Sequence, residues 1–284
     1  MPAEEGISRF RTTQLMITSD FEVYHYREPY FKSLDFHSHD FYEAYLFLDG
    51  SVTYYIEEQA YDLCAGNLLV IPPGRMHRPV ISNSAAVYER MVLWLNGEYL
   101  RQLNPDGELL RQLESFGGER GYLAELSGQE LTLSIGVLQR LSALGPEAPA
   151  MYAGALISVF LFGAVLALNR QAFPRKKESE DLIPQVIRYI NEHFTESIQL
   201  DSLCARFFIS KFHLTRRFKD YTNATIYDYI LSKRISLARR LLRQGTPASL
   251  VSGQCGFSDY SGFYRAFTAK TGLSPTQFKQ TMEC

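Results

Sequence analysis

The last hundred residues of this chain contain one pattern twice. The stretch "SKFHLTRRFKDYTNAT" begins at Ser210, and "DYSGFYRAFTAKTGLS" begins 49 residues later, at Asp259. Matching positions hold residues of the same kind: Leu214 and Phe263, Arg216 and Arg265, Phe218 and Phe267, and Tyr229 and Phe278. Self-similarity of this kind indicates one supersecondary unit used twice. A fold for this region must therefore accommodate two copies of one small motif.

Each copy is predicted to form two helices joined by a tight turn. In the first copy, Asp201 and Ser210 are the expected N-caps, because short polar side chains accept hydrogen bonds from the first turn of a helix. In the second copy, Pro247 suits a first helical position, and Ser258 is the expected cap of the second helix.

One long helix is expected between the two copies. Residues 226–243 have helical spacing, and Gly245 ends the helix. At a rise of 1.5 Å per residue, its length is about 27 Å. Such a helix could hold two recognition helices about one turn of DNA apart, roughly 34 Å, on one face of a duplex.

In each copy of the motif, the helix after the turn carries basic side chains between its apolar positions. Apolar residues four apart face the core, so Arg216 and Arg265 point away from it. An arginine there can donate two parallel hydrogen bonds to the major-groove edge of guanine. Three further side chains are placed to neutralise phosphates: Lys211, Arg217 and Lys219. The alternative is a solvated basic face, which is common for a single helix and less expected for a duplicated motif.

The charge of the chain is divided unevenly. Residues 182–284 hold 14 Lys and Arg against seven Asp and Glu, whereas residues 1–181 hold 15 against 24. The net charge of −2 therefore conceals a basic second part of +7 and an acidic first part of −9. This asymmetry indicates that only the second part binds a polyanion.

The duplicated region resembles the DNA-binding domain of the AraC/XylS family of bacterial transcription regulators. The stretch "GFSDYSGFYRAFTAKTGLSPTQFK" closely follows the signature of that family, and the resemblance covers about the last hundred residues. The resemblance implies base-reading side chains in both motifs: Phe212, Thr215 and Arg216 in the first, and Ser261 and Arg265 in the second. Two departures weaken the second motif. Gly262 replaces a larger residue, and "FTAK" replaces the usual basic pair.

Residues 21–95 are predicted to form short strands. The runs "VTYYIEEQAYDL", "NLLVIPPG" and "YERMVLWL" are rich in β-formers and are separated by Gly- and Pro-containing turns. Short strands at close spacing are typical of a sandwich or barrel. From Gly97, the spacing of Leu and Ile becomes helical, in "EYLRQL", "ELLRQLESF" and "QELTLSIGVLQRLSAL".

Histidine and glutamate residues gather at the start of this strand-rich part. The stretches "HSHDFYEAYLFLDG" and "GNLLVIPPGRMH" resemble the two cupin motifs, with His37, His39, Glu43 and His77 at the ligand positions. If residues 37–43 form one strand, alternate side chains point into a small barrel. Three imidazoles and one carboxylate suit nickel, manganese, iron or zinc. The same groups also suit hydrogen bonds to a polar effector, and Ile81 stands where the enzyme pattern has Asn.

The resemblance extends to a sensor role for this domain. Many sugar-sensing members of the AraC family have such an N-terminal barrel, whose aromatic side chains contact sugar CH groups. The expected effector-binding residues are His37, His39, Glu43, Tyr54, His77, Arg90 and Trp94.

An uncharged segment, residues 148–169, precedes a polar stretch, "NRQAFPRKKESED". The uncharged segment is long enough to cross a membrane. A helix that is apolar all round can equally be buried between domains or subunits. We favour the buried helix, because only one flank is basic and no second apolar span exists. The polar stretch is the expected linker, with a boundary near Lys177.

These observations predict an α+β protein of two domains. Residues 1–177 form a cupin-like sensing and dimerisation domain with a helical extension, and residues 178–284 form an all-α domain with two helix-turn-helix motifs. The predicted function is DNA-binding transcription regulation gated by a small-molecule effector, a sugar or related metabolite. The alternatives are a metal-dependent cupin enzyme with a DNA-binding tail and a regulator gated by dimerisation alone.

We further expect a homodimer without enzymatic activity. No cofactor is required, and a divalent metal in the barrel is an open alternative. The four cysteines are scattered and form no CxxC pair, which suits a reducing cytoplasm. The N-terminus has no apolar run after a basic start, so no signal peptide is expected.

Overall fold

The structure is a computed structural model, which describes residues 16–28, 35–82, 87–114, 116–117, 121–145, 147–170 and 181–280. The chain divides into two compact units. Among the described residues, the first comprises 16–28, 41–73 and those of 79–170, and the second comprises 35–40, 74–78 and 181–280. The expected linker and the boundary near Lys177 lie outside the described residues, so the domain limits stay a prediction.

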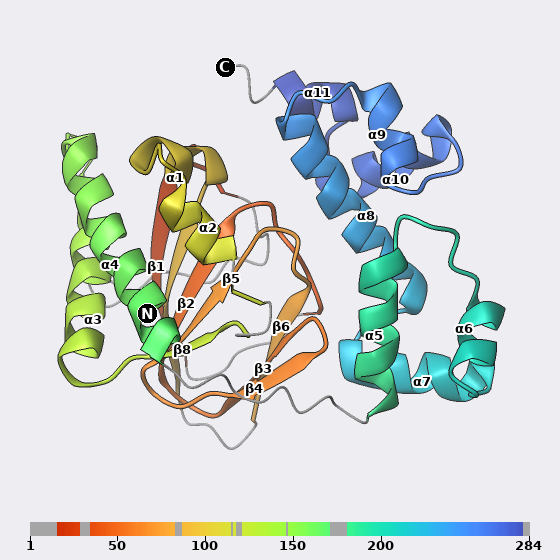
Figure 1. The fold of residues 1–284 in the computed structure, drawn as a ribbon, viewed down its shortest axis with the longest axis horizontal. Coiled ribbons are helices and arrows are strands. Elements are labelled where there is room, and N and C mark those ends of the chain that lie inside the picture. The colour runs from red at the N-terminus through yellow and green to blue at the C-terminus, as the bar shows by residue number, and fades with distance from the viewer. Residues whose placement is uncertain are drawn as a thin grey trace. The chain divides into compact units, whose positions relative to one another are not determined.

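Eight strands among the described residues form two sheets (Figure 1). The larger sheet has the order β1-β7-β2-β5-β8, and the smaller has the order β4-β3-β6. The strands are β1 (Phe21–Glu28), β2 (Tyr42–Asp49), β3 (Val52–Ile56), β4 (Gln59–Asp62), β5 (Asn67–Ile71), β6 (His77–Ile81), β7 (Tyr88–Leu95) and β8 (Leu123–Glu125). The described strands thus form two open sheets rather than one closed barrel, within the predicted α+β class.

The central strands of the large sheet are buried on both faces. β5 is buried at every residue and β2 at its first six, whereas β3 alternates buried and half-buried positions. Continuous burial is typical of a strand packed on two sides, and alternation of a strand packed on one. One core contains Leu46, Leu68 and Leu93 with residues of the helices, and the other contains Tyr45, Tyr54 and Trp94 with residues of both sheets.

Four helices supply the first of these cores: α1 (Gly97–Leu103), α2 (Glu108–Glu114), α3 (Gly128–Ser142) and α4 (Ala150–Arg170). α3 and α4 lie side by side (Figure 1). α4 is the predicted uncharged helix, and its length and composition would allow it to cross a membrane. Half of its most apolar window is buried inside the unit, including Ile157 and Leu161.

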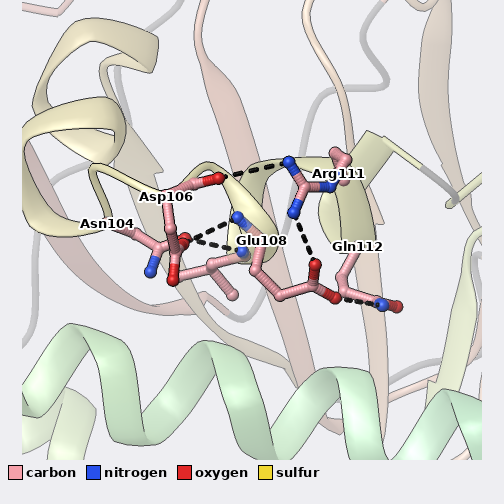
Figure 2. Close-up of polar contacts among 6 residues, drawn as sticks. Asn104, Asp106, Glu108, Arg111 and Gln112 are labelled. Carbon is pink, nitrogen blue, oxygen red and sulfur yellow. Dashed lines mark hydrogen bonds and ion pairs between the residues drawn. The ribbon is translucent and has the colours of Figure 1, made fainter.

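Polar side chains fix the start of α2, as Figure 2 shows. Asn104 Oδ1 accepts a hydrogen bond from the Leu109 amide at 2.7 Å, and Asp106 Oδ1 accepts one from the Glu108 amide at 2.9 Å. Glu108 in turn accepts hydrogen bonds from Gln112 and Arg111, which lower the pKa of its carboxyl group. These bonds satisfy the amides at the helix start, and Leu109 and Leu113 are thereby held in the core.

The second unit consists of seven helices in its described residues: α5 (Leu182–His193), α6 (Leu200–Arg206), α7 (Lys211–Thr222), α8 (Ile226–Arg243), α9 (Ala248–Gln254), α10 (Tyr260–Thr271) and α11 (Pro275–Gln280). The long helix α8 has the predicted bounds, and Gly245 follows it with a φ of 85°. Leu214, Phe218, Phe263 and Phe267 are fully buried, so the predicted anchors of both copies are confirmed.

Three of the expected helix caps differ from the prediction. Ser210 caps α7, since its hydroxyl accepts from the His213 amide. α6, however, begins after Gln199, so that Asp201 lies in its first turn. Pro247 is the N-cap of α9 rather than its first residue. Asp259, not Ser258, caps α10: its carboxylate accepts from the Gly262 amide at 2.7 Å.

Candidate effector site and nucleic-acid interface

In each copy of the repeated motif, the second helix presents exposed polar side chains; these helices are α7 and α10. All predicted DNA-contacting residues are exposed on α7 or α10: Lys211, Phe212, Thr215, Arg216, Arg217, Lys219, Ser261 and Arg265. The Phe212 ring is 67% exposed, although it is apolar. An exposed ring near the start of a recognition helix can contact a thymine methyl group.

Local contacts orient several of these side chains. Lys211 forms an ion pair with Asp201 at 2.6 Å, and Arg216 lies 3.9 Å from Asp220. Both pairs are exposed, so each holds its basic group only weakly. The Thr215 hydroxyl donates to the carbonyl oxygen of Lys211 at 2.8 Å. α7 therefore offers Arg216 and Phe212 outward, while the hydroxyl of Thr215 is engaged within the helix.

Glu43 lies on the inner face of the large sheet. It is 5% exposed and stands opposite Trp94 in the register of β2 and β7. Trp94 Nε1 donates to one carboxylate oxygen at 2.9 Å, and the Tyr54 hydroxyl donates to the other at 3.4 Å. Burial raises the pKa of Tyr54 well above its usual value, and Glu43 adds to this rise. The phenol is therefore neutral, as a donor to a carboxylate must be.

Arg90 is the buried cation of the same interior. Its guanidinium lies over the rings of Tyr88 and Tyr26, at 4.0 and 4.6 Å from their centroids, and forms an ion pair with Glu28 at 3.1 Å. Burial lowers the pKa of Arg90, but Tyr88, Tyr45 and Glu28 raise it by more. Arg90 is thus a charged group held between aromatic faces.

The histidines do not lie on one strand. β2 begins only at Tyr42, so residues 37–41 precede it, and the prediction of a shared strand face for 37–43 is wrong. His37 instead forms an isolated bridge with His77, the first residue of β6. The ring of His77 lies 4.3 Å from the ring of His37 and 4.8 Å from that of His39. A loop and a strand start therefore gather the three imidazoles.

Two of the four predicted metal ligands, His39 and His77, lie close together, and His37 lies beside His77. His77 Nδ1 donates a hydrogen bond to the Arg75 carbonyl oxygen at 2.8 Å. Such second-shell bonds orient histidine ligands at metal sites. The donor set therefore suits a divalent ion.

Several residues of this interior were not identified from the sequence. Tyr45 and Tyr88 share a hydrogen bond of 2.5 Å between their hydroxyl groups, and the Tyr24 ring lies 4.9 Å from the Trp94 ring. Strand alternation could have identified these tyrosines. Residue 45 lies on the same face of its strand as Glu43, and residue 88 lies on the same face as Arg90 and Trp94.

Two family models match the chain. The model described as "AraC-like ligand binding domain" matches residues 18–134, and the model described as "Helix-turn-helix domain" matches residues 203–281. The predicted effector-binding residues fall within the first match, and α7 and α10, which carry the predicted DNA-contacting residues, fall within the second.

Relatives with curated names are transcription regulators. The chain is 23% identical to the transcriptional activator RhaS of Salmonella arizonae over 86% of its length and 87% of that protein. It is 23% identical to the activator RhaR of Escherichia coli over 86% of each protein. A probable transcriptional regulator of Photobacterium leiognathi, LumQ, is 32% identical over 38% of the chain and 44% of LumQ. These names indicate regulators rather than enzymes.

Solved structures show a weaker likeness. ToxT from Vibrio cholerae aligns over 92% of the chain and 98% of its own, with 15% identity and a TM-score of 0.41. The DNA-binding domain of AdpA, solved with a target DNA, aligns over 36% of the chain and 93% of its own, with 26% identity and a TM-score of 0.34. At these TM-scores the likeness carries no argument about function.

Proposed function

Because the chain belongs to the AraC family of DNA-binding transcriptional regulators, we propose that a polyhydroxylated metabolite, a sugar or a related compound, is its effector and gates its binding to DNA. The observation that carries the proposal is the buried Glu43, which accepts hydrogen bonds from Trp94 and Tyr54 among aromatic rings. A carboxylate accepts hydroxyl groups, and aromatic faces contact the CH groups of a sugar ring. The enzyme alternative has no support among the named relatives.

The effector class is tested by thermal stability. The full-length protein is heated with a panel of pentoses, hexoses and sugar acids, and with fatty acids and aromatic acids for comparison. A ligand at 100 times its dissociation constant stabilises by about 2.7 kcal/mol. We expect such a shift with at least one sugar, and its loss in Glu43→Gln. A shift with an apolar acid alone, and with none of the sugars, would contradict the proposal.

A second candidate function is metal binding through His37, His39 and His77. Its support is the gathering of their imidazole rings, with the ring of His77 4.3 Å from that of His37 and 4.8 Å from that of His39. The test is elemental analysis of untagged protein, together with zinc titration of the wild type and of His39→Ala. One equivalent in the wild type and none in the variant would support a site, whereas zinc binding that is unchanged in the variant would contradict it.

Two further features of the function are proposals. A homodimer is supported by an exposed apolar stripe along α4, with Ala155, Val159, Phe162 and Leu166 at alternating spacings of four and three. This spacing is typical of a helix that packs against another helix.

A cytoplasmic location suits a DNA-binding regulator. The DNA contacts proposed for α7 and α10 are those of the exposed residues described above.

A further inference from the structure

The segment after α5 is held by both halves of the second unit. α5 packs against α7, the recognition helix of the first motif, and the chain leaves α5 at Phe194. Arg234, in the middle of α8, donates from Nε to the Phe194 carbonyl and from a terminal nitrogen to the Glu196 carbonyl, both at 2.7 Å. One planar guanidinium thus fixes two alternate carbonyls of segment 194–196.

The second motif contacts the residue between them. Gly256 lies in the turn between α9 and α10 with a φ of 81°. A Cβ atom at this position would lie 2.4 Å from the carbonyl oxygen of Thr195, which no real structure tolerates. The turn of the second motif therefore rests directly on the backbone of the segment that the first motif carries. The next residue, Phe257, places its ring 5.8 Å from the Arg234 guanidinium.

These contacts bind three parts of the unit at one point. A single connecting helix would fix the distance between two motifs but would leave each motif free to turn at its end. Here the segment 194–196, the middle of α8 and the turn at Gly256 are joined by hydrogen bonds and by backbone contact. Relative rotation of the motifs would break the Arg234 bonds or separate Gly256 from Thr195.

We propose that Arg234 and Gly256 are positioning residues, which fix the two recognition helices relative to each other so that the protein binds two DNA half-sites at a single spacing. DNA turns by about 34–36° per base pair. One inserted base pair therefore rotates the second half-site away from a rigid protein. If one recognition helix loses its base contacts, the affinity for DNA should fall at least about tenfold. A flexible protein would tolerate the insertion. The inference rests on DNA binding by both motifs.

The experiment selects binding sites from random DNA duplexes with the full-length protein, so no operator needs to be known beforehand. It compares the wild type with Arg234→Ala, Arg234→Lys and Gly256→Ala. Arg240→Ala is the control, because Arg240 is exposed on the same helix and its loss removes the same charge. Circular dichroism verifies folding, and fluorescence anisotropy measures affinity for the selected site with zero, one or two inserted base pairs.

We expect the wild type and Arg240→Ala to select one spacing and to lose at least about tenfold in affinity per inserted base pair. Arg234→Ala should select several spacings and lose less than about threefold per inserted base pair. Arg234→Lys cannot span both carbonyls, so its affinity loss should lie between those of the wild type and Arg234→Ala. Several spacings in the wild-type selection would overturn the proposal, and so would a single spacing in a folded Arg234→Ala or Gly256→Ala variant. Failure of the wild type to enrich any sequence would contradict DNA recognition itself, which is a separate result.

Discussion

Trp94 and Glu43 face each other across β7 and β2, and the indole nitrogen donates a hydrogen bond of 2.9 Å to the carboxylate. Both side chains are almost completely buried. A buried carboxylate is costly unless its oxygens are hydrogen-bonded, so the hydrogen bond from Trp94 stabilises the buried Glu43.

The first prediction concerns this hydrogen bond. Trp94→Phe keeps an aromatic ring but removes the donor, so we expect a loss of about 1–3 kcal/mol in the free energy of unfolding. Tyr54→Phe, whose hydrogen bond is longer at 3.4 Å, should cost less. Urea denaturation measures both, with Tyr152→Phe on the surface of α4 as the control. Equal stability of Trp94→Phe and the wild type would show that the carboxylate does not depend on the indole.

The second prediction concerns the cap of α10. The Gly262 amide and the Ser258 hydroxyl donate to Asp259 and lower the pKa of its carboxyl group below the usual 3.8. Its folded pKa lies below its unfolded pKa, so the stability it contributes is present at neutral pH and is lost as the pH falls through the folded value. Asp259→Ala should therefore lower the melting temperature at pH 7, and this difference from the wild type should shrink as acidification protonates the carboxyl group. The matched variant Ser258→Ala should change the melting temperature less at pH 7. A larger loss of melting temperature in Ser258→Ala than in Asp259→Ala would indicate that Ser258 caps the helix.

The third prediction compares two glycines of the same helix. Gly262 lies inside α10, and an added Cβ would meet only the Asp259 carboxylate at an ordinary 3.5 Å. Gly262→Ala should therefore stabilise the protein by about 0.5–1 kcal/mol. Gly272 ends the helix with a φ of 75°, so Gly272→Ala should destabilise it by about 1 kcal/mol. Chemical denaturation measures both. A destabilising Gly262→Ala would indicate that the small residue is needed for packing.

The fourth prediction concerns the exposed stripe on α4. A charge in the middle of an apolar interface is left without water, which costs several kcal/mol. Val159→Glu and Phe162→Glu should convert a dimer into a monomer, as measured by light scattering after size exclusion. Gln139→Glu, at an exposed position of α3, is the control. A wild type that is monomeric at micromolar concentration would remove the basis of the dimer proposal.

Much of the helical unit could be predicted from the sequence. The bounds of α8 follow from a threonine cap at one end and a glycine with positive φ at the other, both of which are local signals. The sequence does not show whether Ser258 or Asp259 caps α10. Both residues can cap a helix, and only the extended backbone of Asp259, at φ −150° and ψ 158°, decides it.

The candidate effector site was predicted less well, because part of it depends on pairing between residues distant in sequence. Glu43, Tyr54 and Trp94 share one interior, as expected, because strand alternation is a short-range rule. The histidines were placed on a strand that the chain does not form, because the His37–His77 bridge joins residues 40 positions apart. Pairing over such a distance leaves no periodic signal in the sequence. The role of Arg234 was also missed, since its acceptors are backbone carbonyls of segment 194–196.

We propose that the two helix-turn-helix motifs bind specific DNA under the control of a bound effector. The most direct measurement is fluorescence anisotropy of the full-length protein on its selected duplex, with and without the sugar that most stabilises it. We expect Arg216→Ala and Arg265→Ala each to weaken binding by about 1–3 kcal/mol and to relax base preference locally. Lys211→Ala should weaken all sequences alike and reduce the salt dependence. The sugar should change the affinity of the wild type at least about fivefold, the lower limit of typical allosteric coupling, and should leave that of Glu43→Gln unchanged. Unaltered affinity and base preference in both arginine variants, together with no response to any stabilising ligand, would contradict the account.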